Sequence, residues 1–70
     1  MSWNTLDPHI RELATKTLTS KQLTVLKLNT NGMSTRRIAL ALDISEPAAR
    51  GLLTRAHQRL NIELRKDTSA

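Results

Sequence analysis

The chain has 70 residues, a length that allows one small domain. About 39% of the residues are apolar and Trp3 is the single aromatic residue, which is enough for a thin, mostly aliphatic core. The absence of cysteine excludes disulfide scaffolds, thiol catalysis and cysteine-ligated zinc. Eleven Lys and Arg residues against six Asp and Glu give a net charge of +5. This balance favours polyanionic partners such as nucleic acid.

The positive charge is concentrated in the middle of the chain. Basic and acidic residues cancel in residues 1–20 and again in residues 61–70. The excess lies in residues 21–60, where two acids, Asp43 and Glu46, stand against Lys21, Lys27, Arg36, Arg37, Arg50, Arg55 and Arg59. We therefore expect the central part of the chain to make the electrostatic contacts.

Membrane spans and catalytic motifs are not found in the sequence. No apolar stretch approaches the roughly 20 residues that a membrane span needs, and the first residues lack the features of a signal peptide. We therefore expect a cytoplasmic protein with no membrane partner. His9 and His57 lie far apart, and no paired carboxylate, Ser-His-Asp arrangement, phosphate-binding glycine loop or cofactor motif is present. The sequence thus predicts no metal, no cofactor and no enzyme.

A first helix is predicted over residues 7–18, after an N-terminal tail at residues 1–6. Asp7 and Pro8 are typical of an N-cap and a first helical position, because proline lacks only an N–H that would have no partner there. One helical face then follows at Ile10, Leu13, Ala14, Thr17 and Leu18. We expect Trp3 to cover the open end of the small core.

A second helix is predicted from Thr19 to the Asn31-Gly32 pair. Thr19 and Gln22 have the spacing of a capping box, in which each side chain accepts a hydrogen bond from the other residue's backbone. Gly32 can adopt the left-handed conformation that often ends a helix. This helix therefore has a predicted start and a predicted end.

Two further helices are predicted after Gly32, joined by a tight turn. Ser34 caps a short helix at about 34–42, and Ser45 caps a longer one at about 46–61. No segment alternates polar and apolar residues, so the predicted fold is all-α. Two helices joined by a short turn, the second longer and basic, are typical of a helix-turn-helix.

A helical wheel at about 100° per residue separates two faces of the last predicted helix. Its inner face centres between Ala49, Leu52 and Ala56. Its outer face consists of Pro47, Gly51, Thr54 and Gln58, with Arg50 on one side and Arg55 on the other. Arginine can pair with guanine and threonine can contact the thymine methyl group in the major groove. An ordinary solvated helix face has the same pattern, so both interpretations remain open.

Four stretches between residues 18 and 62 match a known pattern. They are LTxxxxxVLxL from Leu18, GMSxxxIAxxL from Gly32, ISE from Ile44 and RLNI from Arg59. Together they resemble the DNA-binding domain of the LuxR/FixJ response-regulator family. The stretch LLTRAHQRL from Leu52 is also similar to the helix-turn-helix of sigma-factor region 4.

Length and the helix signals together predict a single four-helix domain. Within it, an accessory helix at 7–18 precedes a helix-turn-helix core at 19–62, and a tail follows at 66–70. By the resemblance to the LuxR/FixJ family, the helix from Ser45 would be the recognition helix. With Gln58 added from the wheel, the positions expected to face bases are Glu46, Pro47, Arg50, Gly51, Thr54 and Gln58. The positions expected near phosphates are Lys21, Ser34, Thr35, Arg36, Arg37 and Arg55.

Some residues depart from the family pattern. Ala48-Ala49-Arg50 stands where the family usually has Thr-Val-Lys, which removes a phosphate-contacting hydroxyl and keeps a basic position. Gly51 inside a helix costs about 1 kcal/mol relative to alanine, which indicates either close approach of a backbone or simple tolerance. The family's dimerising helix would begin near Leu64, close to the last residue given. The accessory helix is the candidate to replace it, and dimerisation is left open.

These observations support three functional hypotheses. The first is a sequence-specific double-stranded DNA-binding transcriptional regulator of phage or bacterial origin, associated with the nucleoid. Tight operator binding by so small a module would require a homodimer. The second is a protein-binding module that uses a sigma region 4-like surface to engage RNA polymerase, a sigma factor or another bacterial partner. Exposed apolar surface at Trp3, Leu64 and the helix 7–18 would distinguish it. The third is a membrane-active basic helix, against which the caps and turns argue.

Overall fold

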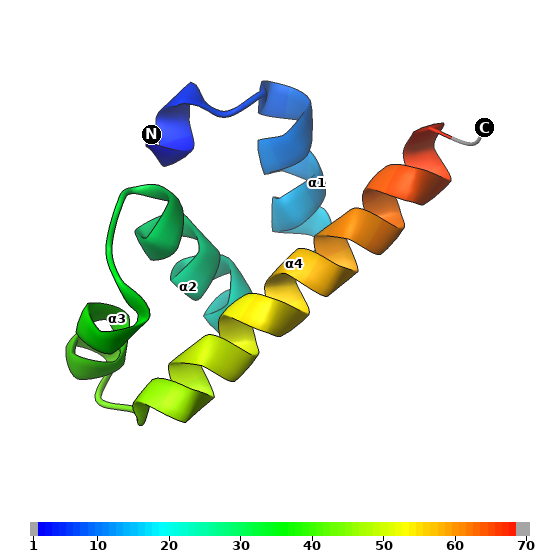
Figure 1. The fold of residues 1–70 in the computed structure, drawn as a ribbon. Coiled ribbons are helices and arrows are strands. Elements are labelled where there is room, and N and C mark those ends of the chain that lie inside the picture. Colours follow the sequence, from blue (N-terminus) through cyan, green and yellow to red (C-terminus); the bar gives the residue numbers. More distant parts are fainter. Residues whose placement is uncertain (1, 69–70) are drawn as a thin grey trace.

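The computed structural model describes residues 2–68, with side chains described as far as Lys66. These residues form a short 3-10 helix and four α-helices, which are η1 (Trp3–Thr5), α1 (Pro8–Thr17), α2 (Ser20–Thr30), α3 (Thr35–Leu42) and α4 (Glu46–Thr68). No strand occurs in this part of the chain, which confirms the all-α prediction. The three shorter α-helices all pack against the long α4 (Figure 1).

The helices begin at the predicted caps. Asp7 Oδ1 accepts a hydrogen bond of 2.8 Å from the backbone N–H of His9. The Thr19 hydroxyl accepts one of 3.2 Å from the N–H of Gln22, and Gln22 Oε1 accepts one of 3.1 Å from the N–H of Thr19. Ser34 Oγ caps α3 in the same way at 3.3 Å. Each cap satisfies an N–H that the first helical turn leaves without a partner, which stabilises a helix by about 1 kcal/mol.

A three-residue turn at 43–45 joins α3 to α4. Asp43 ends α3 in the left-handed conformation, with φ 56° and ψ 46°. Aspartate occupies this region more readily than most residues. Ser45 Oγ then accepts a hydrogen bond of 3.2 Å from the N–H of Ala48 at the start of α4. The predicted helix-turn-helix is therefore formed by α3, this turn and α4.

The core consists of two adjoining clusters that share α4. One, between α1, α2 and α4, consists of Ala14, Leu18, Leu26 and Ala56. The other, between α2, α3 and α4, consists of Val25, Ile38, Ala39 and Ala49. Leu53 of α4 packs against both clusters. Because α4 supplies one wall of each cluster, its inner face is fixed along the helix and its outer face is left uncovered.

The N-terminal residues pack against the domain instead of forming only a tail. The helix η1 lies against α2. The backbone N–H of Trp3 donates a 2.6 Å hydrogen bond to Asn31 Oδ1 at the far end of α2. The indole ring packs on the first cluster, and Lys27 Nζ lies 5.5 Å from the ring centroid, within the range of a cation–π contact. Trp3 therefore covers the core as the sequence indicated.

Helix α4 runs well beyond residues 60–61, the earliest end that the sequence indicated. It continues to Thr68, past the expected end of the core at residue 62 and into the expected tail at 66–70. After Gly51 the sequence holds no glycine or proline that would end the helix. Glu63 also forms ion pairs with the basic residues four positions before it, at 3.5 Å, and three positions after it, at 3.7 Å. Such pairs support a helix along its surface.

A separate helix beginning near Leu64, which the resemblance implied, is not found in the described residues. The backbone is helical on both sides of Leu64, because nothing in the sequence interrupts α4 there. Instead, α1 packs on α4, with Ala14 and Leu18 in the same buried cluster as Ala56. The accessory helix is therefore an integral part of the core.

Candidate DNA-binding interface

The outer face of α4 forms a continuous polar stripe. Ala49 and Ala56, on the inner face, are fully buried. The exposed members of the expected base-facing set are Pro47, Arg50, Thr54 and Gln58. Residues three or four positions apart lie on the same side of a helix, so these side chains extend from the same surface. We call these four residues and Gly51, which lies among them, the outer stripe.

Gly51 lies in the middle of the outer stripe. A Cβ atom built on Gly51 would have no other atom within 4 Å, apart from its own helix backbone and immediate neighbours. The backbone there is ordinary α-helix, since Gly32 is the glycine with positive φ. Neither packing nor backbone conformation within the protein therefore requires glycine at this position. Because glycine has no side chain, the backbone of α4 is less covered at the centre of the stripe.

An ion pair stands at the beginning of the outer stripe. Arg50 Nη2 donates a hydrogen bond of 3.0 Å to Glu46 Oε1. The side chains are 65% and 43% exposed, respectively, so both remain accessible to a ligand. Glu46 also lies in the first turn of α4, where the helix dipole favours a negative charge.

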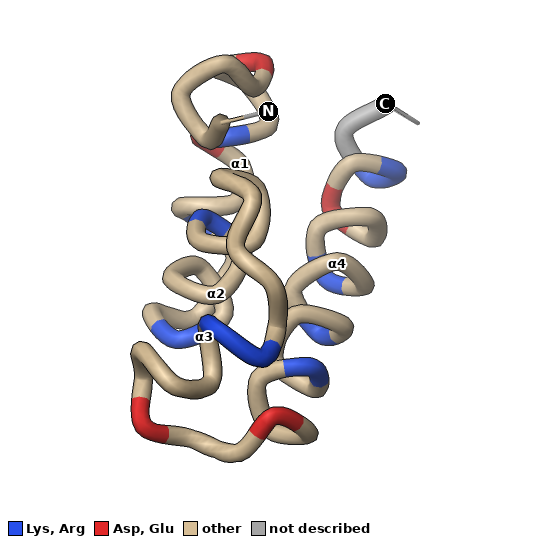
Figure 2. Tube along the Cα trace, turned by 60° about the vertical axis from the view of Figure 1, so that its left-hand side comes forward, with Lys and Arg blue, Asp and Glu red and all other residues tan. Residues whose placement is uncertain are grey.

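The start of α3 carries a group of basic and hydroxyl residues on one side of the stripe. Ser34, Arg36 and Arg37 are exposed and Thr35 is half-buried. Neither arginine forms an ion pair with a residue that the structure describes. Because α3 packs on α4, these charges lie close to α4. Figure 2 shows the basic segment of α3 beside the first half of α4.

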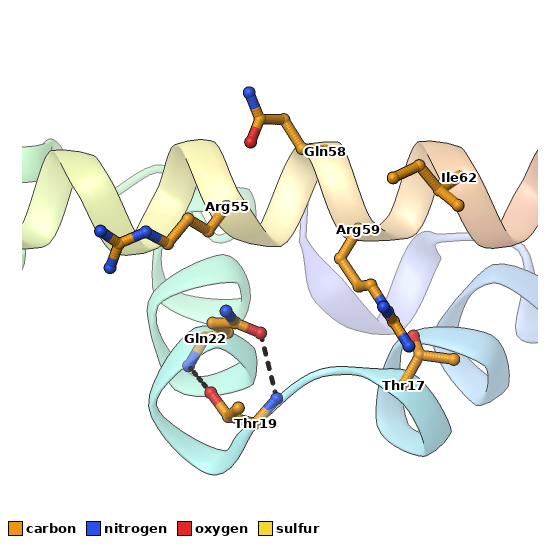
Figure 3. A pocket seen from close by; sticks show the side chains of 7 residues that line it. All are labelled: Thr17, Thr19, Gln22, Arg55, Gln58, Arg59 and Ile62. Carbon is orange, nitrogen blue, oxygen red and sulfur yellow. Dashed lines mark hydrogen bonds between the residues drawn. The ribbon is translucent and has the colours of Figure 1, made fainter.

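Lys21 and Arg55 lie on either side of the start of α2, where they line two separate depressions. Both are exposed. Arg55 contributes to an open depression of about 380 Å³ between α4 and the junction of α1 with α2, lined by Thr17, Thr19, Gln22, Arg55, Gln58, Arg59 and Ile62. In Figure 3 Arg59 extends toward Thr17, whereas Gln58 points away from Thr19 and Gln22. The lining contains two arginines and no acid.

The structure thus brings the expected site residues together around α4. It also adds residues that were not expected there, since Thr17, Gln22 and Arg59 line the depression beside Arg55. Arg59 follows Arg55 by four positions and could have been found from helical spacing. The contribution of Thr17 and Gln22 depends on how α1 and α2 meet α4, which helical spacing within one element does not specify.

Other kinds of site find little support in the described residues. No group of three or more His, Asp or Glu side chains among them is arranged to hold a metal ion. None of the described helices is long and apolar enough to cross a membrane. His57 is exposed on α4, so it is not a core residue.

The family comparison agrees with this arrangement. The model of the GerE family, described as bacterial regulatory proteins of the luxR family, matches residues 16–68. The chain belongs to the LuxR family of bacterial regulatory proteins. The match includes α2, α3 and α4 and begins near the end of α1. No curated protein and no solved structure matched the chain.

Membership in the LuxR family establishes the general activity. This is a family of helix-turn-helix DNA-binding regulators, and its activity is regulatory, not enzymatic. This LuxR-type domain is therefore a DNA-binding transcription regulator whose partner is double-stranded DNA.

Proposed function

We propose that this LuxR-type domain recognises a specific duplex DNA sequence, with residues 46–61 of α4 in the major groove. The observation that carries the proposal is the outer stripe, which no other described element covers, on a helix whose neighbours α2 and α3 both begin with exposed basic residues. A major groove admits one α-helix and is bordered by phosphates on both sides. An uncovered polar helix with basic residues on the neighbouring helices has the charge pattern that such a groove requires.

The basic residues have the role of positioning α4. Arg36 and Arg37, with the hydroxyl residues beside them, are assigned to the phosphates along one strand. Lys21 and Arg55 are assigned to those along the other strand. Contacts to phosphates fix the register and orientation of a protein on DNA without identifying the sequence. They also make affinity depend steeply on salt.

The outer stripe has the role of recognising bases. Arg50 can donate two hydrogen bonds to guanine, Gln58 can pair with adenine, and Thr54 can contact a thymine methyl group. Pro47 and Gly51 offer apolar surface to the same groove. Arg50 precedes the other two polar residues by one and two helical turns, so α4 can address successive base pairs.

The protein-binding alternative lacks the apolar surface that it requires. Trp3 packs against the core, and both Trp3 and Leu64 are half-buried. The exposed large apolar residues of the described chain are Leu40 and Ile62, on different helices. Single exposed apolar residues are common on soluble domains. DNA is therefore the partner that the surface favours, which would place the protein at the nucleoid.

The experiment is selection of binding sites from a random duplex library at about 150 mM salt, near physiological ionic strength. Enrichment of a defined motif is the expected result. A palindromic motif with half-sites about one helical turn apart would indicate that a homodimer binds. Recovery of random sequence, with uniform salt-sensitive binding, would refute sequence-specific recognition.

A triple variant provides the matched control. Replacing Arg50, Thr54 and Gln58 with alanine removes the polar atoms of the outer stripe and leaves both core clusters intact. We expect the variant to remain helical by circular dichroism and to retain salt-dependent binding to any duplex. It should no longer enrich the motif. A variant that still enriches it would show that another surface recognises the bases.

A further inference from the structure

Glu46 has a position that the proposed function does not by itself explain. It is the acidic residue at the start of the helix assigned to DNA, and 43% of its side chain is exposed. A carboxylate near a duplex is repelled by phosphates, so it lowers affinity for every sequence. The helix dipole favours a negative charge in the first turn of α4, where Glu46 lies. The contact through which Glu46 can act on recognition is its hydrogen bond with a neighbouring side chain.

The neighbour is Arg50, one turn further along α4. The 3.0 Å contact joins Glu46 Oε1 to Arg50 Nη2. The acid precedes the base by four residues, the more favourable orientation for an ion pair on a helix. The guanidinium is a rigid plane with five N–H donors, and this contact occupies one nitrogen. The donors on the remaining nitrogens are left for another acceptor.

The pair changes how Arg50 can interact with DNA. A free arginine on a mobile side chain can move to a nearby phosphate, which contributes equally on all sequences. An arginine paired with a carboxylate has lost part of its rotational freedom before DNA arrives, and part of its charge is balanced. Such an arginine gains most binding energy where two acceptors lie together in a plane and can both accept hydrogen bonds, as N7 and O6 of guanine do.

We propose that Glu46 is a positioning residue that restricts Arg50 to a base contact and so determines specificity. The inference rests on the proposed function. The Glu46 carboxylate lowers the affinity for all DNA, and it lowers the affinity for other sequences more than the affinity for the selected motif. The effect of Glu46 is therefore measured as the ratio of the affinity for the selected motif to the affinity for a scrambled duplex. A purely structural role for Glu46 would leave this ratio unchanged.

The test compares the wild-type chain with Glu46→Gln on two duplexes, one carrying the selected motif and one with the same composition scrambled. We expect the ratio of the two affinities to fall about two- to threefold, mainly because the scrambled duplex binds more tightly. Arg50 is then free to neutralise a phosphate, so the log–log salt slope on the scrambled duplex should steepen by about one. Adding Arg50→Ala to Glu46→Gln should remove that increase.

Two further variants separate positioning from simple repulsion. Glu46→Asp keeps the negative charge and shortens the side chain, so it should lose the contact and lower the ratio as Glu46→Gln does. Glu12→Gln removes an equivalent exposed pair, with Lys16 at 3.1 Å on α1, and should leave ratio and slope unchanged. Circular dichroism would confirm that each variant is folded.

The results can overturn the inference without overturning the function. If Glu46→Gln keeps the wild-type ratio and slope while Arg50→Ala still relaxes the motif, Glu46 does not position Arg50 and the proposed function stands. If Glu46→Asp behaves as wild type while Glu46→Gln does not, the residue acts by repulsion alone. If the wild-type chain selects no motif, the proposed function and this inference fall together.

Discussion

Replacing Gly51 with alanine should make the domain more stable and its binding to DNA weaker. A Cβ atom on Gly51 finds open space in the protein, so the methyl group introduces no clash. The helix gains the difference in propensity between alanine and glycine, about 1 kcal/mol. In a domain of this size that corresponds to a rise in melting temperature of roughly 4–8 °C. Thermal unfolding followed by circular dichroism measures the change.

The same methyl group would stand at the centre of the surface assigned to the major groove. If α4 approaches the bases or backbone closely there, affinity for the selected duplex should fall by about 1–3 kcal/mol, the usual effect of extra volume in a packed contact. Fluorescence anisotropy with a labelled duplex measures this loss. Ala41→Gly, at an exposed position of α3, is the control with opposite sign. It should lower stability by a similar amount and leave DNA affinity unchanged.

Two results would contradict this reasoning in different ways. A Gly51→Ala variant that melts at or below the wild-type temperature would mean that glycine is needed inside the protein. A variant that is more stable and binds the selected duplex as tightly as wild type would mean that nothing approaches α4 at that point. The glycine would then be tolerated without a role in recognition.

Three other substitutions address the remaining parts of the molecule. Arg50→Ala should cost about 1–3 kcal/mol on the selected duplex and relax preference at one base position; an equal loss on every duplex, measured by competition binding, would assign Arg50 to phosphate. Arg36→Ala should weaken binding to all duplexes alike and reduce the salt slope by about one, so a salt titration with unchanged slope would remove Arg36 from the phosphate contacts. Trp3→Ala should destabilise the domain by about 2 kcal/mol, less than a fully buried aromatic residue would, because the ring is half-buried against the first cluster. Urea unfolding would show this loss, and an unchanged midpoint would mean that η1 contributes nothing to stability.

The local features of the fold could be predicted from the sequence because their causes are local. Asp7, Thr19, Ser34 and Ser45 each precede a helix by one residue, and a cap acts on N–H groups two or three residues away. The left-handed residue that ends α3 is Asp43, and it lies in the tight turn that the sequence indicated between the last two helices. These contacts involve neighbours in sequence, so the pattern of residue types contains them.

Features that depend on distant or repeated contacts were harder to predict. The Trp3–Asn31 hydrogen bond joins residues 28 positions apart, and no spacing rule anticipates it. The end of α4 lacks a stop signal, and its continuation reflects ion pairs around Glu63. Glu46 and Arg50 were assigned separately to bases, although their spacing already allowed the pair that the structure contains. The roles of the individual site residues remain predictions.

The uninterrupted course of α4 determines which changes in this domain alter recognition and which destroy it. Both core clusters contact the same helix, so the orientation of its buried face relative to its outer stripe is fixed from Ala49 to Leu60. Substitutions within the stripe leave the buried face in place, which makes those positions suitable for altering the preferred sequence. Inserting one residue between Leu53 and Ala56 would instead rotate the rest of the helix by about 100°. After such an insertion, the residues that follow cannot keep Ala56 in the core and Gln58 on the outer stripe at the same time.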